Sequence, residues 1–269
     1  MQREAIVVKS SVNQLQHASA VMFYWQIEVN ENQEISQTIL PTIYQDLIFP
    51  LQGGLKIEGY SSFVNFAFAG PLLKKGLKIN FSGESRIFGF RLNPLFVNRF
   101  FRISPAEFIQ GPNELNKVLY PNLYRCLMNL VKDAPFETLA NKLNNFFSQN
   151  SLAGHDEKMI TYALEQIRDN PEVNIAELSQ SNQCSTKWLQ VQFQRYLGAK
   201  PYEFVKLSRF NRFLSLLNHH ADKSLTTLAL QAGYYDQSHL IKEFKNFNAN
   251  TPRQFRQNFT DFYRIMNHL

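Results

Sequence analysis

Two hydrophobic patterns divide the chain. Up to about residue 110, short aromatic and β-branched segments are separated by Gly, Pro, Asn and Ser, and they read FYWQIEV, YQDLIFPL, LKIEG, NFAFAG, LKINF and RIFGFRL. Segments of this kind at this spacing predict the strands of an antiparallel β-barrel or β-sandwich. After residue 110 the apolar residues recur every three or four positions, as in helices that bury one face. The predicted fold is therefore α+β with two domains.

The first predicted helices follow the β-rich part directly. Pro121 and Pro135 each precede a stretch with helical periodicity, and proline is well suited to the start of a helix. The second helix carries one apolar stripe, formed by Phe136, Leu139, Leu143 and Phe146. We predict a β-rich sensing or dimerisation domain over residues 1–110, a helical connector over 111–152 and a helical domain over 153–269.

The helical domain contains an internal duplication. Residues 175–204 align with residues 225–255, and the offset between the copies changes from 50 to 51 in a turn. In each copy a short helix is followed by a turn and then by a second helix with apolar residues four positions apart. These pairs are Leu189 and Phe193 in one copy, and Leu240 and Phe244 in the other. The pattern predicts two helix-turn-helix units, at about 174–204 and 224–255.

The turn inside each unit sets requirements on its residues. The two helices cross closely, so small side chains are needed there, and the turn favours a residue that tolerates a positive φ. In the second unit Ala229 and Gly233 meet these requirements, whereas Ser179 and Gln183 at the matching positions of the first unit meet them less well.

A proline closes each unit. Gly198 in the first unit and Asn248 in the second are expected to adopt the left-handed conformation that ends a helix, with Pro201 and Pro252 starting the next one. One helix, at about 201–218, is predicted to join the units. It would span about 25 Å, a distance suited to successive major-groove faces about 34 Å apart.

Charge changes the picture only in the helical domain. The whole chain has a net charge of +6, but residues 185–260 contain eleven Lys and Arg against four Asp and Glu. A basic block of this size suggests an anionic polymer as partner, and a solvated basic face is the alternative.

Several classes of function are disfavoured by composition. No apolar run is long enough for a membrane helix, and the N-terminus lacks the apolar core of a signal peptide, so a cytoplasmic location without membrane contact is expected. Cys126 and Cys184 lack the paired spacing of a zinc or redox site and are interpreted as free thiols. His17 is the only histidine before residue 150, and no catalytic set can be assembled there. We therefore expect no enzyme activity, no metal and no cofactor.

Residues 155–260 resemble the DNA-binding domain of AraC/XylS-type bacterial transcription regulators. The resemblance is strongest over LTTLALQAGYYDQSHLIKEFKNFNANTPRQFR, from its Ala through its Gly-aromatic turn to the closing Pro and Phe. In that family two such units, joined by one long helix, read adjacent major grooves. The resemblance implies DNA contacts by Lys187, Trp188, Gln190, Val191, Gln194, Gln237, Ser238, His239, Lys242, Lys245, Arg253 and Arg256.

The chemistry of these side chains suits base and phosphate recognition. Gln pairs with adenine, Lys donates to guanine, and apolar Val191 can meet a thymine methyl group. Arg253 and Arg256 flank the last short helix, where phosphate contact is expected. Packing is the alternative role for Trp188 and solvent exposure the alternative for His239. Arg209, in the joining helix, matches a structural arginine of the family.

The β-rich domain resembles an N-terminal domain of unknown ligand found in other AraC-type regulators, on the stretches ILPTIYQDLIFPL, FAGPL and GFRLNPLFVNRFF. A small barrel can hold one small ligand. Candidate pocket residues are Tyr24, Trp25, Phe66, Phe68, Phe81, Phe88 and Phe90, for which ordinary core packing is the alternative.

The sequence as a whole predicts a sequence-specific transcription regulator modulated by a small-molecule effector in the N-terminal domain. The alternative is a constitutive DNA-binding regulator whose N-terminal domain only dimerises or binds a protein. The expected partner is double-stranded DNA, and further candidates are RNA polymerase, the effector and a second copy of the chain.

Overall fold

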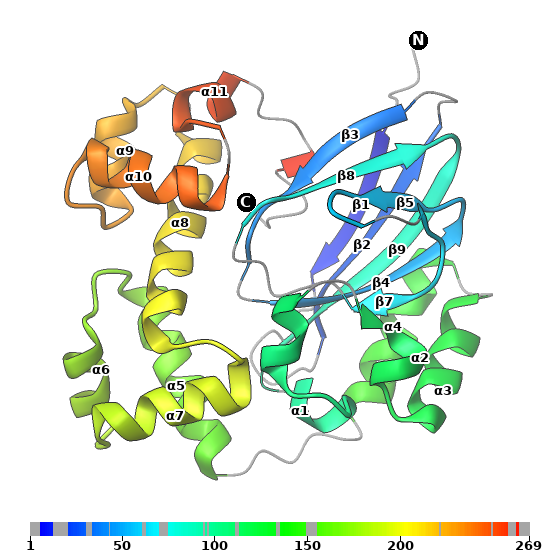
Figure 1. The fold of residues 1–269 in the computed structure, drawn as a ribbon, viewed down its shortest axis with the longest axis horizontal. Helices are drawn as coiled ribbons and strands as arrows, with labels where there is room; N and C mark the ends of the chain where they lie inside the picture. Colours follow the sequence, from blue (N-terminus) through cyan, green and yellow to red (C-terminus); the bar gives the residue numbers. More distant parts are fainter. Residues whose placement is uncertain are drawn as a thin grey trace. The chain divides into compact units, whose positions relative to one another are not determined.

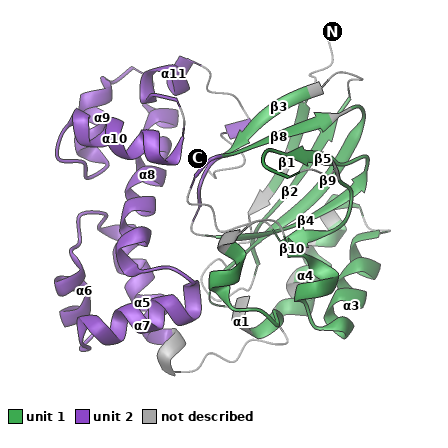
Figure 2. Ribbon diagram, in the orientation of Figure 1, with its two compact units in different colours: residues 1–39, 44–72, 77–152 green, residues 40–43, 73–76, 153–269 purple. Residues whose placement is uncertain are grey.

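The structure is a computed structural model. The chain forms two compact units (Figure 2). Unit 1 comprises Met1–Ile39, Tyr44–Leu72 and Leu77–Leu152, and unit 2 comprises Leu40–Ile43, Leu73–Gly76 and Ala153–Leu269. The structure describes residues 6–12, 21–30, 34–42, 44–60, 63–69, 75–93, 95, 97–110, 113–132, 135–148, 155–220, 222–248, 250–257 and 262–263.

Unit 1 contains two antiparallel sheets (Figure 1). In the larger sheet the strands lie in the order β1 (Ile6–Val12), β2 (Val21–Val29), β9 (Ser85–Leu92), β4 (Gln45–Gln52), β7 (Phe68–Ala69) and β10 (Asn113–Glu114). In the smaller sheet the order is β3 (Glu34–Ile39), β8 (Leu77–Ser82), β5 (Leu55–Ile57) and β6 (Phe63–Val64). The prediction of an antiparallel sandwich is confirmed.

The centre of the larger sheet separates its residues into two faces. Residues directly opposite each other on antiparallel strands share a face. Tyr24 lies opposite Phe90, and Trp25 lies opposite Gly89. Because successive residues of a strand point to opposite faces, Tyr24 and Phe90 lie on one face and Trp25 on the other.

Five helices follow strand β9 in the described part of unit 1, and β10 lies between the second and the third of them. Their bounds are α1 (Val97–Phe100), the 3-10 helix η2 (Pro105–Gln110), α2 (Leu115–Val118), α3 (Pro121–Lys132) and α4 (Phe136–Ser148). Helix α4 covers the Phe90 face of the sheet, since the ring of Phe147 lies 5.7 Å from that of Phe90.

The apolar stripe of α4 differs from the predicted one at its end. Leu139, Leu143 and Phe147 are buried, whereas Phe136 and Phe146 are only partly buried. The spacing of four residues, and not of three, continues the line that faces the sheet. The prediction was therefore wrong for Phe146 and missed Phe147.

Unit 2 is helical over its described part after residue 154. Its helices are α5 (His155–Asp169), α6 (Ile175–Ser181), α7 (Thr186–Leu197), α8 (Pro201–His219), α9 (Leu225–Gln231), α10 (Gln237–Phe247) and α11 (Pro252–Gln257). Figure 1 shows α8 as one long helix, with α6 and α7 near one end and α9 and α10 near the other. The two predicted helix pairs are confirmed, and α8 covers the range given for the joining helix.

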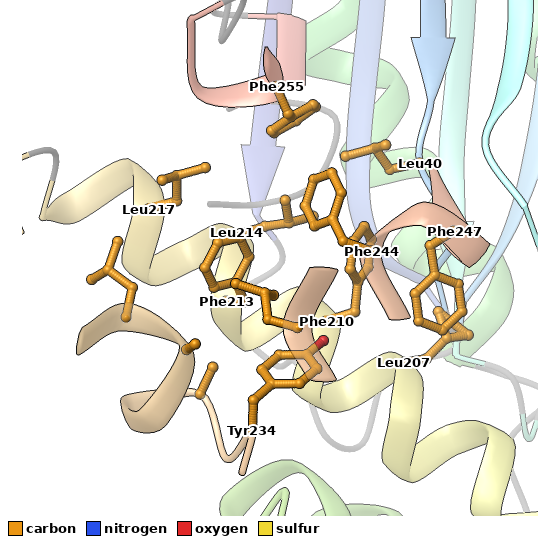
Figure 3. Packing of buried hydrophobic residues seen from close by; sticks show 14 residues of the cluster. Leu40, Leu207, Phe210, Phe213, Leu214, Leu217, Tyr234, Phe244, Phe247 and Phe255 are labelled. Carbon is orange, nitrogen blue, oxygen red and sulfur yellow. The ribbon is translucent and has the colours of Figure 1, made fainter. Parts of the chain in front are cut away.

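The core around the second helix pair is a dense aromatic cluster (Figure 3). Phe244 of α10 lies 5.3 Å from Phe210 and 5.9 Å from Phe213, both on α8, measured between ring centroids. Leu40, from one of the short segments of unit 2, is buried in the same cluster. Helix α10 is thus held against α8 along its apolar side.

Some features are absent from the described segments. None of their helices is long and apolar enough to cross a membrane. No three His, Cys, Asp or Glu side chains in these segments come close enough together to hold a metal ion. Cys126 and Cys184 are both free thiols, as predicted.

Candidate nucleic-acid interface

Side-chain caps define where the paired helices begin. Each cap oxygen accepts a hydrogen bond from a backbone N–H in the first turn, which satisfies a donor that the helix itself leaves unpaired. The capping residues are Asn174 for α6, Ser185 for α7, Ser224 for α9 and Asp236 for α10. The same device at all four starts determines which residues open each recognition helix, α7 and α10.

The turns of the two units have a positive φ at the same position, but with different residues there. Gly233 has a φ of 90°, as predicted, and Gln183 at the matching position adopts a φ of 51°, the only positive φ of a non-glycine residue in the described part of the chain. Ala229 is fully buried, and Ser179 in its place is also buried, with its hydroxyl 3.0 Å from the Thr186 hydroxyl. The first unit thus accommodates the less suitable residues through a hydrogen bond and a left-handed glutamine.

Three of the four residues predicted to end or begin helices at the ends of the units do so in the structure. Gly198 ends α7 with a φ of 73°, and Pro201 and Pro252 begin α8 and α11. The prediction for Asn248 was wrong, since its φ of −136° is extended. Its backbone N–H still donates to the Phe244 carbonyl at 2.7 Å, so α10 closes without a left-handed residue.

Helix α10 presents a polar face opposite its buried one. Its buried residues are Leu240, Glu243, Phe244 and Phe247. The side chains of Gln237, Ser238, Lys242 and Lys245 are exposed. Four of the residues that the family resemblance implied for DNA contact are therefore accessible, and two of them are positively charged.

His239, a fifth implied contact, is oriented by neighbours inside the unit. Its Nε2 lies 3.5 Å from Oε1 of Glu243, and its Nδ1 accepts from the Tyr235 backbone N–H at 3.5 Å. Its ring is edge-on to that of Tyr234, and its side chain is about one-third exposed, at 34%. One part of the ring thus remains accessible while the rest contacts Tyr234 and Glu243.

A buried polar group lies beneath α10 at Glu243, which is 4% exposed. Lys206 of α8 approaches it, with 3.8 Å between Nζ and Oε1. Arg209, also on α8, has its guanidinium 5.5 Å above the Tyr234 ring. Burial raises the pKa of the Tyr234 phenol and the negative charge of Glu243 adds to the increase, while the positive charge of Arg209 opposes it. These groups join α10 to α8 through charge as well as apolar packing.

The residues implied for DNA contact on the first recognition helix, α7, include one positive charge, Lys187. Lys187, Gln190 and Val191 are exposed, and Trp188 is partly buried. Gln194 is exposed but donates through Nε2 to the Gly198 carbonyl at 2.9 Å, so its amide is engaged at the end of its own helix.

The duplication extends to a buried polar position that the sequence analysis did not single out. Gln192 of α7 is 8% exposed and corresponds to Glu243 at the offset of 51. Its Oε1 has no hydrogen-bond partner among the described residues. The spacing of three residues from Leu189 and Leu240 is the signal that places both polar residues on the buried side.

The basic residues near α11 have different surroundings. Arg253 is exposed. Arg256 is partly buried, and its Nη1 donates to the Lys223 carbonyl at 3.0 Å. Arg256 therefore stabilises the segment between α8 and α9.

One exposed aromatic residue in the second unit was also missed. Tyr235 lies in the turn just before the α10 cap and is 87% exposed. The sequence motif contains two adjacent aromatic residues, and only the packing of Tyr234 into the core shows which of them faces solvent.

The candidate pocket residues of unit 1 do not share one surface. Tyr24, Phe88 and Phe90 lie on the face covered by α4, whereas Trp25 lies on the opposite face. Phe68 lies opposite Ile48 and Phe81 belongs to the smaller sheet. Phe66 is 38% exposed, and the six others are buried.

The Trp25 face contains buried polar groups. Arg91, which is 3% exposed, pairs with both carboxylate oxygens of Asp46, at 2.9 and 3.0 Å. The Arg91 guanidinium also lies 5.6 Å from the ring of Phe23. On the same face the buried Nε1 of Trp25 has no hydrogen-bond partner among the described residues.

Two family models match separate parts of the chain. Residues 178–258 match the model of a helix-turn-helix domain, and residues 14–111 match that of a domain of unknown function, DUF6597. An uncharacterized HTH-type transcriptional regulator of Haemophilus influenzae is 27% identical over 118 residues, which are 42% of this chain and 38% of that protein. Another from Staphylococcus aureus is 24% identical over 145 residues, 54% of this chain and 18% of that protein. The match thus spans well under half of each curated relative.

A solved structure shares the fold over nearly the whole chain. ToxT from Vibrio cholerae superposes with a TM-score of 0.50 at 12% identity, covering 94% of this chain and 98% of that one. This likeness concerns the fold alone.

Proposed function

We propose that the chain is a sequence-specific DNA-binding transcription regulator of the AraC type, because residues 178–258 match a helix-turn-helix domain and residues 14–111 match DUF6597. It belongs with regulators and not with enzymes. Its mechanism is binding, in which exposed side chains of α7 and α10 meet base edges in two major-groove segments.

One observation supports this proposal above the others. The capped start of α10 exposes Gln237, Ser238 and Lys242, and Ser238 and Lys242 lie on the side away from Leu240 and Phe244. Amide and ammonium donors on a rigid helix suit the acceptors N7 and O6 of purines in the major groove. A basic surface around them supplies the sequence-independent attraction to phosphates.

The test is selection of bound sequences from a random duplex pool by the full chain. We expect Gln237→Ala and Lys242→Ala each to relax the preference at one base pair, by about 1–3 kcal/mol. Lys242→Ala also lowers the slope of log affinity against log salt by about 1. Arg256→Ala is expected to relax base preference less than either.

Arg253→Ala is the matched control, because Arg253 is exposed and Arg256 also donates to Lys223. It should weaken binding to all sequences alike, since a phosphate contact carries no sequence information. Equal weakening of every sequence by all the variants would contradict the assignment of base readers.

For unit 1 we propose a sensing role, in which a small molecule favours one arrangement of the chain and shifts the population able to bind DNA. The support is chemical: Trp25 offers a buried, unpartnered donor near the face where Arg91 and Asp46 are buried. The alternative is that unit 1 serves only dimerisation or protein binding and that DNA binding is constitutive. Contacts with RNA polymerase and a homodimer stay predictions.

Thermal shift of the full chain across a metabolite library separates these two roles. A compound that raises the melting temperature and also changes operator affinity supports sensing. If no compound in the library does both, the constitutive alternative is favoured.

A further inference from the structure

A hydrogen bond joins the two helices of the second unit at the first residue of the recognition helix. The Thr226 hydroxyl on α9 donates to Oε1 of Gln237 on α10, with 2.8 Å between the oxygens. Both side chains are exposed, so the bond lies at the surface that the proposed function assigns to DNA. It contributes nothing to the buried core of the unit.

The chemistry of the amide gives this bond a directional consequence. A glutamine amide has one acceptor oxygen and two N–H donors on nitrogen. When a hydroxyl donates to the oxygen, the nitrogen is turned away from that hydroxyl, and its donors are presented elsewhere. Without the hydroxyl, the terminal torsion of glutamine is broad and roughly two-fold, so oxygen and nitrogen can exchange places.

The first unit has no such bond. At the offset of 50, Thr226 corresponds to Ala176, which has no hydroxyl, and at the offset of 51 Gln237 corresponds to Thr186. The Thr186 hydroxyl instead lies 3.0 Å from that of Ser179 in its own unit. The contact between Thr226 and Gln237 is therefore specific to the second unit and does not follow from the shared helix-pair geometry.

We infer that Thr226 is a positioning residue for base readout: its hydroxyl holds the Gln237 amide so that Nε2 points its donors at one base pair. This inference rests on the proposed function. The donors need an acceptor on the base edge, which N7 of either purine supplies. Cytosine presents only a donor in the major groove, so it is the base most strongly disfavoured at that position.

The experiment compares sequence selection by the full chain and its variants. Thr226→Val keeps the shape and removes the hydroxyl, Thr226→Ser restores it, and Gln237→Ala removes the reader. Thr227→Val is the matched control, because Thr227 is on the same helix and its hydroxyl lies 2.8 Å from that of Ser224, not near α10.

We expect Thr226→Val to reduce the preference at the Gln237 base pair by about two- to tenfold, the range of one hydrogen bond. Preferences at other positions and the salt slope stay as in the unchanged chain. Thr226→Ser recovers the preference and Thr227→Val retains it. Combined with Gln237→Ala, Thr226→Val has no further effect at that position, because the side chain it orients is gone.

The possible outcomes distinguish the positioning role of Thr226 from the proposed function of reading DNA. An unchanged motif with Thr226→Val, while Gln237→Ala relaxes one base pair, overturns the positioning role and leaves DNA reading intact. A uniform loss at all positions, with a lower melting temperature, shows a purely structural bond and also overturns it. If the unchanged chain selects no motif, the proposed function fails and the inference fails with it.

Discussion

At the scale of single residues, Gly89 packs closely against an aromatic ring. It faces Trp25 across the centre of the larger sheet, and a Cβ at this glycine would overlap the indole ring. The glycine is needed for space, since its φ is not positive. The largest aromatic side chain of the strand therefore fits only because its neighbour has no side chain.

We predict that Gly89→Ala lowers the free energy of unfolding by roughly 1–3 kcal/mol, as overpacked cores do. The same change in a Trp25→Leu background should cost at least about 1 kcal/mol less, because the overlapping ring is absent. Urea unfolding followed by circular dichroism measures both. An equal cost in the two backgrounds would show that the indole is not the obstacle.

At the scale of elements, α4 and the larger sheet are joined by aromatic contacts. Phe147 lies 5.7 Å from Phe90 and 4.9 Å from Phe100, measured between ring centroids. Its neighbour Phe146 is only partly buried and lies edge-on to Phe147. Two adjacent residues of one type thus have unequal roles in attaching the helix.

We expect Phe147→Ala to lower the free energy of unfolding by roughly 3–5 kcal/mol, the range for a buried aromatic residue. Phe146→Ala, the adjacent control, should lower the free energy of unfolding by only roughly 1 kcal/mol, because the Phe146 side chain is partly buried. Comparable losses in urea unfolding of the two variants would rule out the stripe that ends at Phe147.

At the scale of the whole molecule, the length of α8 separates the two helix-turn-helix units. Its 19 residues correspond to about 28 Å at 1.5 Å per residue. Buried residues line both its halves, from Phe204 near the first unit to Leu217 near the second. An uninterrupted helix packed at both ends holds the units at one spacing.

A fixed spacing predicts how the operator tolerates insertions. Once a preferred operator is selected, inserting five or ten base pairs between its two halves should each reduce affinity by roughly a hundredfold, to that of a lone half-site. Five base pairs turn the second half to the opposite side of the duplex, and ten move it by a full turn beyond the reach of α8. Binding that recovers with ten base pairs would show a flexible connection.

Two strands that the sequence analysis did not predict, β1 and β3, are edge strands. The central strands β2, β4 and β9 were predicted because aromatic and β-branched residues fill both their faces. Strands β1 and β3, with the sequences IVVKSSV and EISQTI, were not predicted. Each lies at the edge of its sheet, where polar residues are tolerated and the apolar signal is weak.

The sequence by itself determined the two helix-turn-helix units, the joining helix and the polar face of α10. Helical periodicity, proline and glycine signals, and an internal repeat are local properties, so they can be read without coordinates. Contacts across the helix pairs needed the tertiary structure. Thr226 meets Gln237 eleven residues away, and Glu243 meets Lys206 from another helix. Such pairs form only when packed helices cross, and the crossing determines which polar side chains remain exposed.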